Sequence, residues 1–377
     1  MSRVIDEHRL YLSDVARVSA FATAIAETVK PGDVVLDLGS GTGILGLLAC
    51  RAGAARVYAV DVGGMSTPAR AIARANGFAD RVRMIHGVST QVDLPERADV
   101  LVTDQIGRFG FDAGIVGYVA DARRRLLKPD ARLLPSKIDL WLAPVEAAEV
   151  ADAIEFWNGN PAGFDMRPLR EMAANSGYPR ALPAGDLLGP PVVGGSLDLA
   201  SDCRTVSVDA ETVIARAGTL HGIGGWFSAR LSASVVMSNS PLAADRIGRR
   251  GVVFPIDRPT PVAPGDRIHT RMRIIPDELM VSWNVEVHRQ SGDILKCAHS
   301  TLRGMLIVPD RLNRTRPDYV PHLNARGLAR RSVLELCDGH RSLAEIEREV
   351  YDRHETIFRD RDEAALFVAE VVVGYST

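Results

Sequence analysis

One stretch, residues 34–61, restricts the fold of this chain more than any other feature: "VVLDLGSGTGILGLLACRAGAARVYAVD". It reads as a hydrophobic strand ending at Asp37, a turn with closely spaced glycines, an apolar helix, and a second strand ending at Asp61. Glycine lets the backbone approach a ligand without an intervening β-carbon. A carboxylate about twenty residues after such a turn can accept both hydroxyl groups of a ribose. The pattern predicts a strand–turn–helix unit that binds a nucleoside.

The spacing of the glycines bears on which nucleoside is bound. It is Gly-x-Gly-x-Gly, whereas the turn that wraps a pyrophosphate has Gly-x-Gly-x-x-Gly. With the aspartate at the end of the first strand, this favours S-adenosylmethionine over a dinucleotide. NAD binding and a tight turn without a ligand are the alternatives. The residues that we expect around the cofactor here are Asp37, Gly39, Gly41, Thr42, Gly43 and Asp61.

Composition argues against several classes of protein. A chain of 377 residues exceeds what one core usually supports, so two or three domains are expected. The formal net charge of −2 disfavours a nucleic-acid partner. The four cysteines are far apart and lack Cys-x-x-Cys spacing, so we predict neither a disulfide framework nor a metal site. A polar N-terminus, and no apolar stretch near the roughly 20 residues of a membrane span, predict a soluble cytoplasmic protein without membrane contact.

The pattern of short elements changes twice along the chain. Strands and helices alternate from about residue 34 to 142, which predicts a doubly wound, mainly parallel sheet of the Rossmann-like α/β class. Later strands such as Leu279–Val287 predict an antiparallel sheet or β-barrel. The predicted domains are 1–142, 143–308 with a dimerisation arm at about 152–180, and 309–377, a small helical or winged-helix domain.

Several further segments accompany the glycine turn. They are "HRLYLSDVARVSAFATAI", "IHGVSTQVDLPERADVLVTDQIG", "EFWNGNPAGFDMRPLREMA" and "LHGIGGWFSARL", the last followed by "VVFPIDRPTPVAPGDRI". In order and spacing they resemble the N-terminal helix, cofactor motifs, dimerisation arm and barrel of the protein arginine methyltransferase family, over about residues 5–305. The resemblance implies an S-adenosylmethionine-dependent methyltransferase that forms a homodimer and releases S-adenosylhomocysteine.

The resemblance also assigns cofactor roles outside the glycine turn. Arg17 would grip the methionyl carboxylate, a task that suits the bidentate geometry of a guanidinium group. Asp61 would hold the ribose, and Val88, Ser89 and Thr90 would flank the adenine. The family carries Glu where Thr90 stands, so a hydroxyl group replaces a carboxylate at the adenine amino group.

The acceptor side departs further from the family pattern. Members that modify arginine hold the guanidinium between two glutamates that bracket a Trp-Met-Gly turn. Here Asp104 stands at the first position, and the second falls on Ala113, one residue after Asp112. Aspartate sets each carboxylate back by about 1.5 Å, and a misplacement near 1 Å can cost on the order of a hundredfold in rate. We still predict Asp104 and Asp112 as catalytic residues that orient the acceptor or take its proton.

The chain also departs from the family pattern at a histidine. The family's Thr-His-Trp loop is missing, and "LAADRIGRRGVVF" takes its place with Gly248 or a neighbour at the His position. The role of Asp14, which would pair with that His, is then open. His8, on the N-terminal helix, is the base that we favour, and His221 and His269 are the alternatives.

Residues 323–374 lie outside this family pattern. "LNARGLARRSVLELCDGHRSLAEIEREV" contains a capping box of Ser342 and Glu345, and it resembles the PqqD-like peptide-binding domain. That resemblance implies that the leader of a ribosomally made peptide binds as a strand added to a sheet edge. Tethering would raise the concentration of the rest of the peptide at the methyl donor. A structural appendage without this role is the alternative.

These observations lead to one hypothesis and two rivals. The hypothesis is methyl transfer to a side chain or terminus of a ribosomally synthesised peptide, with a nitrogen or an oxygen as the acceptor. The first rival is a methyltransferase of free arginine or another small guanidino compound. The second is a non-catalytic scaffold that binds cofactor or peptide.

Overall fold

The computed structural model of the chain describes residues 4–202, 205–305 and 317–376. The chain divides into two compact units, Met1–Met305 and Leu306–Thr377. Each unit has a hydrophobic core of its own. The boundary predicted at residues 308–309 lies outside the described residues.

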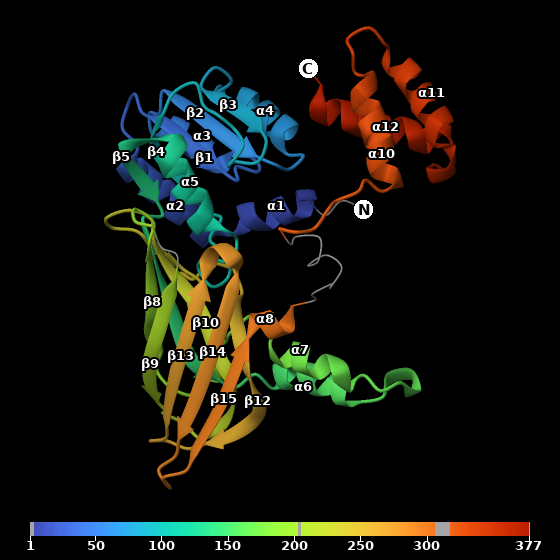
Figure 1. Cartoon of the computed structure of the whole chain (residues 1–377). Coiled ribbons are helices and arrows are strands. Elements are labelled where there is room, and N and C mark those ends of the chain that lie inside the picture. Colours follow the sequence, from blue (N-terminus) through green and yellow to red (C-terminus); the bar gives the residue numbers. More distant parts are fainter. Residues whose placement is uncertain (1–3, 203–204, 306–316, 377) are drawn as a thin grey trace. The chain divides into compact units, whose positions relative to one another are not determined.

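A parallel sheet forms the first part of the larger unit (Figure 1). Its strand order is β3-β2-β1-β4-β5, and all neighbouring strands are parallel. The chain therefore leaves β1 in one direction for β2 and β3 and returns to its other side for β4. This confirms the predicted α/β class with a Rossmann-like sheet. The strands are β1 (Val34–Leu38), β2 (Arg56–Asp61), β3 (Val82–His86), β4 (Ala98–Thr103) and β5 (Leu127–Leu134).

Helices pack on this sheet. Asp14 begins α2, because its side chain accepts a hydrogen bond from the backbone N–H of Arg17. One face of α2 is apolar and buried, and it carries Phe21 into the core. The helices of this part are α1 (Val4–Ser13), α2 (Val15–Thr28), α3 (Ile44–Arg51), α4 (Ser66–Ala75) and α5 (Ile115–Arg125).

Two antiparallel sheets follow, in the orders β7-β12-β10-β6-β8, with β11 beside β10, and β15-β14-β13-β9. They share a core in which the rings of Phe254 and Trp283 lie 5.3 Å apart, and the Trp283 indole donates to the carbonyl oxygen of Pro255. The predicted antiparallel second region is confirmed. The strands are β6 (Lys137–Val145), β7 (Tyr178–Arg180), β8 (Val192–Asp198), β9 (Val206–Val213), β10 (Gly218–Arg230), β11 (Val236–Ser238), β12 (Gly251–Val262), β13 (Arg267–Ile275), β14 (Met280–His288) and β15 (Ile294–Ser300).

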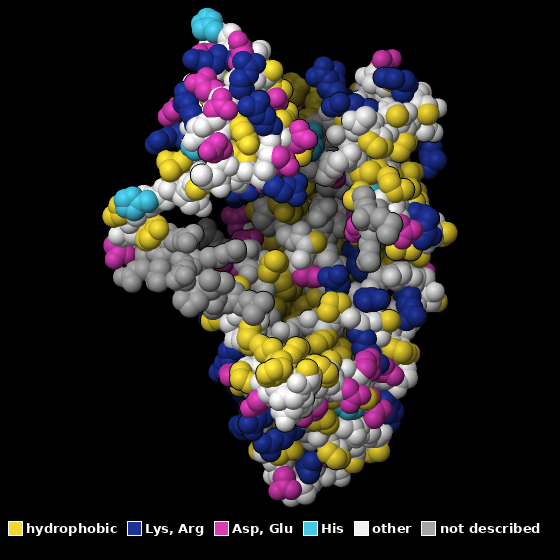
Figure 2. Space-filling view, turned by 90° about the vertical axis from the view of Figure 1, so that its right-hand side faces the viewer, with side chains coloured by type: hydrophobic (Ala, Val, Ile, Leu, Met, Phe, Trp, Pro, Cys, Tyr) yellow, Lys and Arg dark blue, Asp and Glu magenta, His cyan; other side chains and the backbone are white. Residues whose placement is uncertain are grey.

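An arm leaves the six-stranded sheet between β6 and β7. It contains α6 (Ala148–Glu155), short 3-10 turns and α7 (Arg170–Ala174), and it projects to the right in Figure 1. The same arm faces the viewer in Figure 2, where hydrophobic side chains gather on it. Phe156 and Phe164 are exposed. A short helix, α8 (Thr301–Gly304), closes the unit.

The smaller unit is helical in its described part, with α10 (Ala325–Leu336), α11 (Leu343–His354) and α12 (Arg361–Tyr375) around a core of their own. The predicted capping box of Ser342 and Glu345 is confirmed at the start of α11. No strand occurs among residues 317–376 of this unit. In the parts of the chain that the structure describes, no helix is long and apolar enough to cross a membrane.

Truncation of a central strand tests this core. Leu36 is fully buried in β1, so Leu36→Ala should cost about 2–5 kcal/mol of the free energy of unfolding. All four tryptophans belong to the larger unit, so their fluorescence in urea reports on that unit. Val62→Ala, at an exposed position just after β2, is the control and should change the midpoint little. Equal losses for the two variants would contradict the assigned core.

Candidate functional site

The carboxyl edge of the parallel sheet brings most of the predicted site residues together. Asp37 lies near the end of β1, Asp61 ends β2, and Asp104 follows β4. The order in which strands are added to the sheet reverses between β1 and β4, and ligands of open α/β sheets bind in the crevice at such a point. The site therefore lies where the order of the strands predicts it.

The glycine turn has the backbone that its sequence predicts. Gly39, Gly41 and Gly43 have φ angles of 70°, 51° and 77°, a region that side chains with a β-carbon disfavour. The Asp61 carboxylate accepts hydrogen bonds from the backbone N–H groups of Gly41, at 2.7 Å, and Gly63, at 2.6 Å. These bonds fix Asp61 beside the turn, and Thr42 lies half-buried within it.

Two side chains lie against the glycines. A β-carbon on Gly41 would come within 2.5 Å of the His8 ring, and one on Gly39 would overlap the Gln105 side chain. The predicted base His8 thus reaches the turn from α1. Gln105 was not singled out as a site residue from the sequence.

Asp37 is fully buried behind the turn. One oxygen accepts the N–H of Gly46 at 2.9 Å. Burial raises the pKa of Asp37 to about 7, and the Asp61 charge adds to this, against the opposing effect of the Gly46 hydrogen bond. Its other oxygen and the Ser40 hydroxyl are buried without a hydrogen-bond partner among the described residues.

Arg17 lies at the junction of α2 and the crevice. Its Nε donates to Asp104 at 2.5 Å, and its Nη1 donates to the carbonyl oxygen of Tyr11 at 3.1 Å. The guanidinium carbon lies 5.4 Å from the centre of the Tyr11 ring and 5.8 Å from that of Phe21. The residue predicted to hold a carboxylate is therefore buried, oriented and already bound to one.

Asp104 is shared with a second guanidinium. Arg249, just before β12, donates from Nη2 to the same Asp104 oxygen at 2.7 Å and from Nη1 to the carbonyl oxygen of Gly107 at 3.2 Å. Burial lowers the pKa of Arg249, but the Asp104 carboxylate outweighs this and the net shift is upward. The other oxygen of Asp104 is buried without a partner among the described residues. The sequence marked the Arg249 segment as unusual but gave no sign of this contact.

Asp112 has a different environment. One of its oxygens accepts the backbone N–H groups of Arg108, at 2.7 Å, and Phe109, at 2.8 Å. Asn239, also not singled out beforehand, ties the same loop to the sheet by donating to the carbonyl oxygens of Arg108 and Arg250. Asp112 thus shapes the loop that follows Asp104.

Asp14 keeps a partner in the segment that replaces the Thr-His-Trp loop. Its carboxylate accepts the backbone N–H of Gly248 at 2.8 Å. The same carboxylate caps α2, next to Arg17. The contact links the N-terminal helices to the turn that carries Arg249.

The loop predicted to flank adenine follows β3. Val88 and Thr90 are exposed, and the carbonyl oxygen of Ser89 accepts a hydrogen bond from Arg125 at 2.9 Å. Its first residue, Gly87, donates to the Asp61 backbone, so the loop adjoins the proposed ribose site. The alternative bases lie on antiparallel strands. His221, on β10, accepts the backbone N–H of Ala147, and His269, on β13, pairs with Asp209 on β9.

Two comparisons concern families of known proteins. Residues 21–138 match the family described as ribosomal protein L11 methyltransferase (PrmA). Residues 136–285 match the arginine methyltransferase oligomerization subdomain. The two matches meet at the junction between the parallel sheet and the antiparallel sheets.

Individual relatives agree. The chain is 30% identical over 267 residues to protein arginine N-methyltransferase 6 of Xenopus laevis. This match covers 66% of this chain and 77% of that protein. This chain belongs to the protein arginine methyltransferase family. It is also 31% identical to the probable protein arginine N-methyltransferase 6 of Arabidopsis thaliana. That match covers 60% of this chain and about half, 54%, of the plant protein. A solved structure, the Trypanosoma brucei PRMT1 enzyme-prozyme heterotetrameric complex with AdoHcy, has the same fold, with a TM-score of 0.70 and 21% identity over 78% of this chain and 97% of that one.

As a member of this family, the chain is an S-adenosylmethionine-dependent methyltransferase whose cofactor yields S-adenosylhomocysteine. The crevice fits that cofactor, because it combines glycines without β-carbons, an arginine whose guanidinium can bind a carboxylate and an aspartate that can accept the hydroxyl groups of a ribose. The buried oxygens of Asp37 and Ser40 that lack partners in the described chain suit a ligand with polar groups.

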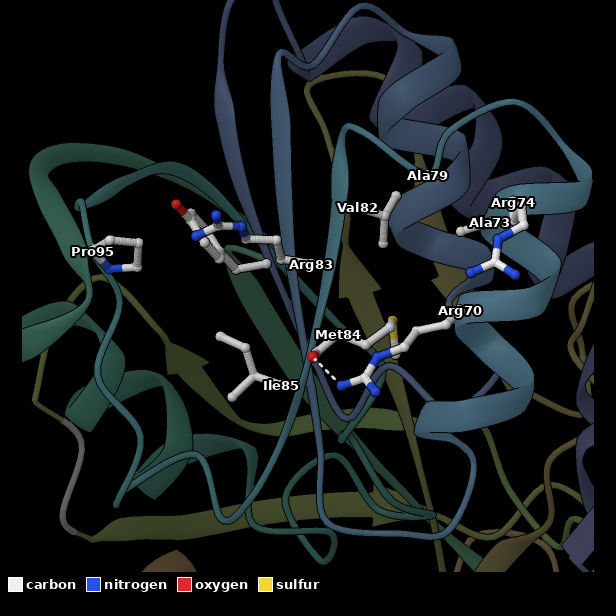
Figure 3. Close-up of a pocket in the computed structure, with 10 residues that line it drawn as sticks. Arg70, Ala73, Arg74, Ala79, Val82, Arg83, Met84, Ile85 and Pro95 are labelled. Carbon is white, nitrogen blue, oxygen red and sulfur yellow. Dashed lines mark hydrogen bonds between the residues drawn. The ribbon is translucent and has the colours of Figure 1, made fainter. Parts of the chain in front are cut away.

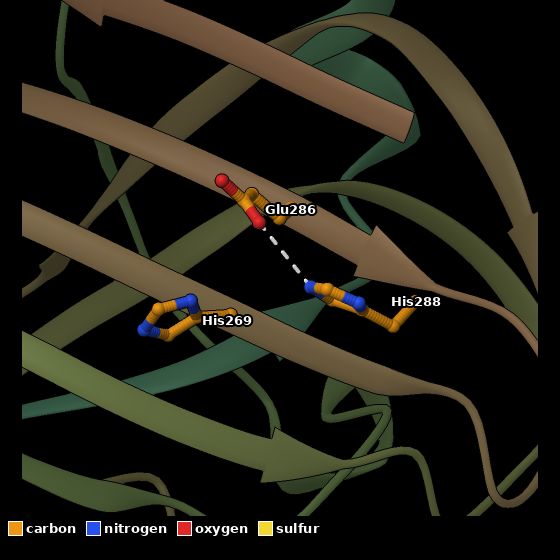
Figure 4. Close-up of side chains that lie close together, drawn as sticks. All are labelled: His269, Glu286 and His288. Carbon is orange, nitrogen blue, oxygen red and sulfur yellow. Dashed lines mark ion pairs between the residues drawn. The ribbon is translucent and has the colours of Figure 1, made fainter. Parts of the chain in front are cut away.

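Two other features lie away from this crevice. A hollow of about 390 Å³ between α4 and β3 is lined by Arg70, Arg74 and Arg83 beside apolar side chains, and by none of the predicted site residues (Figure 3). Strands β13 and β14 bring together His269, Glu286 and His288, and one ring nitrogen or carboxylate oxygen of each lies within 4.8 Å of those of the others (Figure 4). Glu286 is already paired with Arg271 at 2.6 Å and Lys296 at 3.2 Å, so we assign this trio to a cross-strand ion network.

The raised pKa of Asp37 predicts a pH dependence of stability. Its pKa moves from an ordinary 3.8 to about 7 on folding, so its contribution is complete below pH 3.8 and is lost as the pH rises to about 7. Asp37→Asn keeps an oxygen for Gly46 and removes the titration. Relative to that variant, the unfolding free energy of the native protein should fall by up to ~1.4 kcal/mol per pH unit across this range. Urea titrations of both proteins at about pH 5 and about pH 8 measure this, and an unchanged difference between them would refute the assignment.

Proposed function

We propose that this chain transfers the methyl group of S-adenosylmethionine to a side chain or terminus of a ribosomally synthesised peptide. The observation that carries the proposal is the contact between Arg17 and Asp104, at 2.5 Å. It joins the residue expected to bind the cofactor to the residue expected at the acceptor. The contact supports a donor position and an acceptor position next to each other at one edge of the parallel sheet.

We assign each residue of the site a role in the reaction. The cofactor, when bound, supplies a methyl group on a sulfonium that a nucleophile can attack. Arg17 binds its carboxylate, Asp61 its ribose, and Val88, Ser89 and Thr90 border its adenine. Asp104 orients the groups of the acceptor pocket, and His8 is placed at the glycine turn to take a proton from an acceptor that releases one.

The smaller unit supports a peptide as the substrate. It has its own core and resembles a PqqD-like domain, so we propose that it binds the leader of the peptide. Strand addition, the mode expected from the sequence, needs an open strand edge, and residues 317–376 contain none. The proposal is therefore leader binding at this unit, with the mode of binding left to experiment.

The arm supports a homodimer. It lies within the match to an oligomerization subdomain, and its aromatic side chains Phe156 and Phe164 are 56% and 67% exposed. Large exposed aromatic side chains gathered on one projection are typical of protein contact surfaces. We propose that the arm of one copy packs on a second copy of the chain.

The role of Asp104 predicts a loss of turnover. Asp104→Asn keeps the shape of the side chain but removes the charge that holds two guanidinium groups, so kcat should fall at least about tenfold. Asp112→Asn is the control, because Asp112 bonds mainly to its own loop and should affect kcat less. The measurement is the gain of one methyl group in the mass of peptides encoded beside the gene. Unaltered turnover of Asp104→Asn would exclude this role.

Removal of residues 306–377 tests the peptide substrate. The truncated enzyme should show a KM at least about tenfold higher for a peptide with its leader and an unchanged kcat, because tethering acts through effective concentration. The leaderless peptide is the control, and its KM should not change. Methylation of free arginine at the same rate by both proteins, without methylation of any peptide, would favour the small-molecule alternative. Cofactor binding without any methylated product would favour the scaffold.

A further inference from the structure

Arg249 binds Asp104, the carboxylate that the family resemblance assigns to the acceptor. Its side chain is 16% exposed and binds Asp104 at 2.7 Å and the carbonyl oxygen of Gly107 at 3.2 Å. Its guanidinium carbon also lies 5.9 Å from the centre of the Phe227 ring. The turn that carries it is fixed by the bond from Gly248 to Asp14. Arg249 is therefore a built part of the pocket, held from several sides.

The carboxylate in the pocket is already neutralised. Asp104, 10% exposed, receives both Arg17 and Arg249 on one oxygen. Once Arg17 binds the carboxylate of the cofactor, Arg249 still balances the single charge of Asp104. The other carboxylate of this loop, Asp112, bonds to backbone N–H groups and lies near the Arg108 side chain. Of the two carboxylates that the structure describes in this loop, neither keeps an unbalanced negative charge for a cationic acceptor.

Charge then decides between acceptors. The bound cofactor brings a positive sulfonium, and a guanidinium acceptor would add a second cation beside Arg249 in a site largely closed to water, where repulsion is strong. A carboxylate acceptor would reverse the sign of both interactions. The two hydrogen bonds of Arg249 use two of the five N–H groups of a guanidinium, so others can bind a carboxylate oxygen.

We propose that the acceptor of this enzyme is a carboxylate oxygen of a peptide, from an Asp or Glu side chain or the C-terminus, and that Arg249 binds it. This rests on the proposed function, which supplies the donor and the peptide, and it specifies the acceptor. Arg249 selects for an anion at the position where two glutamates would select for a cation.

The chemical step balances without a base. A lone pair of the carboxylate oxygen forms a bond to the methyl carbon while the carbon–sulfur bond breaks, and its electron pair returns to sulfur. The products are a methyl ester and S-adenosylhomocysteine. No proton is released, so the step does not require Asp104, one oxygen of which already accepts both Arg17 and Arg249, to act as a base.

Ligand binding tests the selectivity without turnover. The full chain, saturated with S-adenosylhomocysteine, is titrated by calorimetry with N-acetylglutamate amide and with N-acetylarginine amide. The glutamate probe should bind at least about tenfold more tightly, and Arg249→Gln should abolish that preference. Arg249→Lys, which keeps the charge, should retain part of it. Arg250→Gln, at the exposed neighbouring arginine, is the matched control and should behave like the native chain.

The stability of the product gives a second readout. Peptide methylated with isotopically labelled S-adenosylmethionine is treated with mild base, which hydrolyses a methyl ester to methanol and leaves methylarginine intact. Labelled methanol supports the proposal. A base-stable methylarginine, or tighter binding of the arginine probe than of the glutamate probe by the native chain, overturns it while the proposed function stands. Failure to methylate any peptide would instead refute the proposed function, and the binding experiment would still decide the charge preference.

Discussion

The site depends on one carboxylate shared by two guanidinium groups. Asp104 follows a central strand of the parallel sheet, Arg17 comes from an N-terminal helix, and Arg249 comes from the turn before β12. Buried charges of this kind are stable only when they are paired, because each unpaired charge would lose its hydration without compensation. The same three residues therefore hold the helices, the parallel sheet and an antiparallel sheet together, and they set the charge of the crevice.

Local features of the sequence predicted the glycine turn and the place of Asp61 beside it. The glycine turn and Asp61 lie within one strand–helix–strand unit, so spacing along the chain fixes their spacing in space. The acceptor side was harder, because Arg249 is 145 residues from Asp104 along the chain. The sequence indicated that a family loop was missing there. It did not indicate that an arginine side chain would enter the pocket, since that depends on how distant strands pack.

In the smaller unit, too, the local feature was predicted from the sequence and the feature that depends on tertiary structure was not. The capping box of Ser342 and Glu345 is a local signal, and the helix that it predicted is present. A peptide-binding mode depends on which strand edges are open, and residues 317–376 provide no strand. Family membership rests on the larger unit. The account that we propose is a methyltransferase that keeps the glycine turn and Asp61 on its cofactor side and places the positive charge of Arg249 on its acceptor side.

The most direct test of this account is a crystal structure of the full chain with S-adenosylhomocysteine bound. We expect Arg17 to have turned to the carboxylate of the ligand, while Arg249 stays within hydrogen-bonding distance of Asp104. A structure in which Arg249 has left the pocket, with Asp104 open to receive a cation, would contradict the central claim.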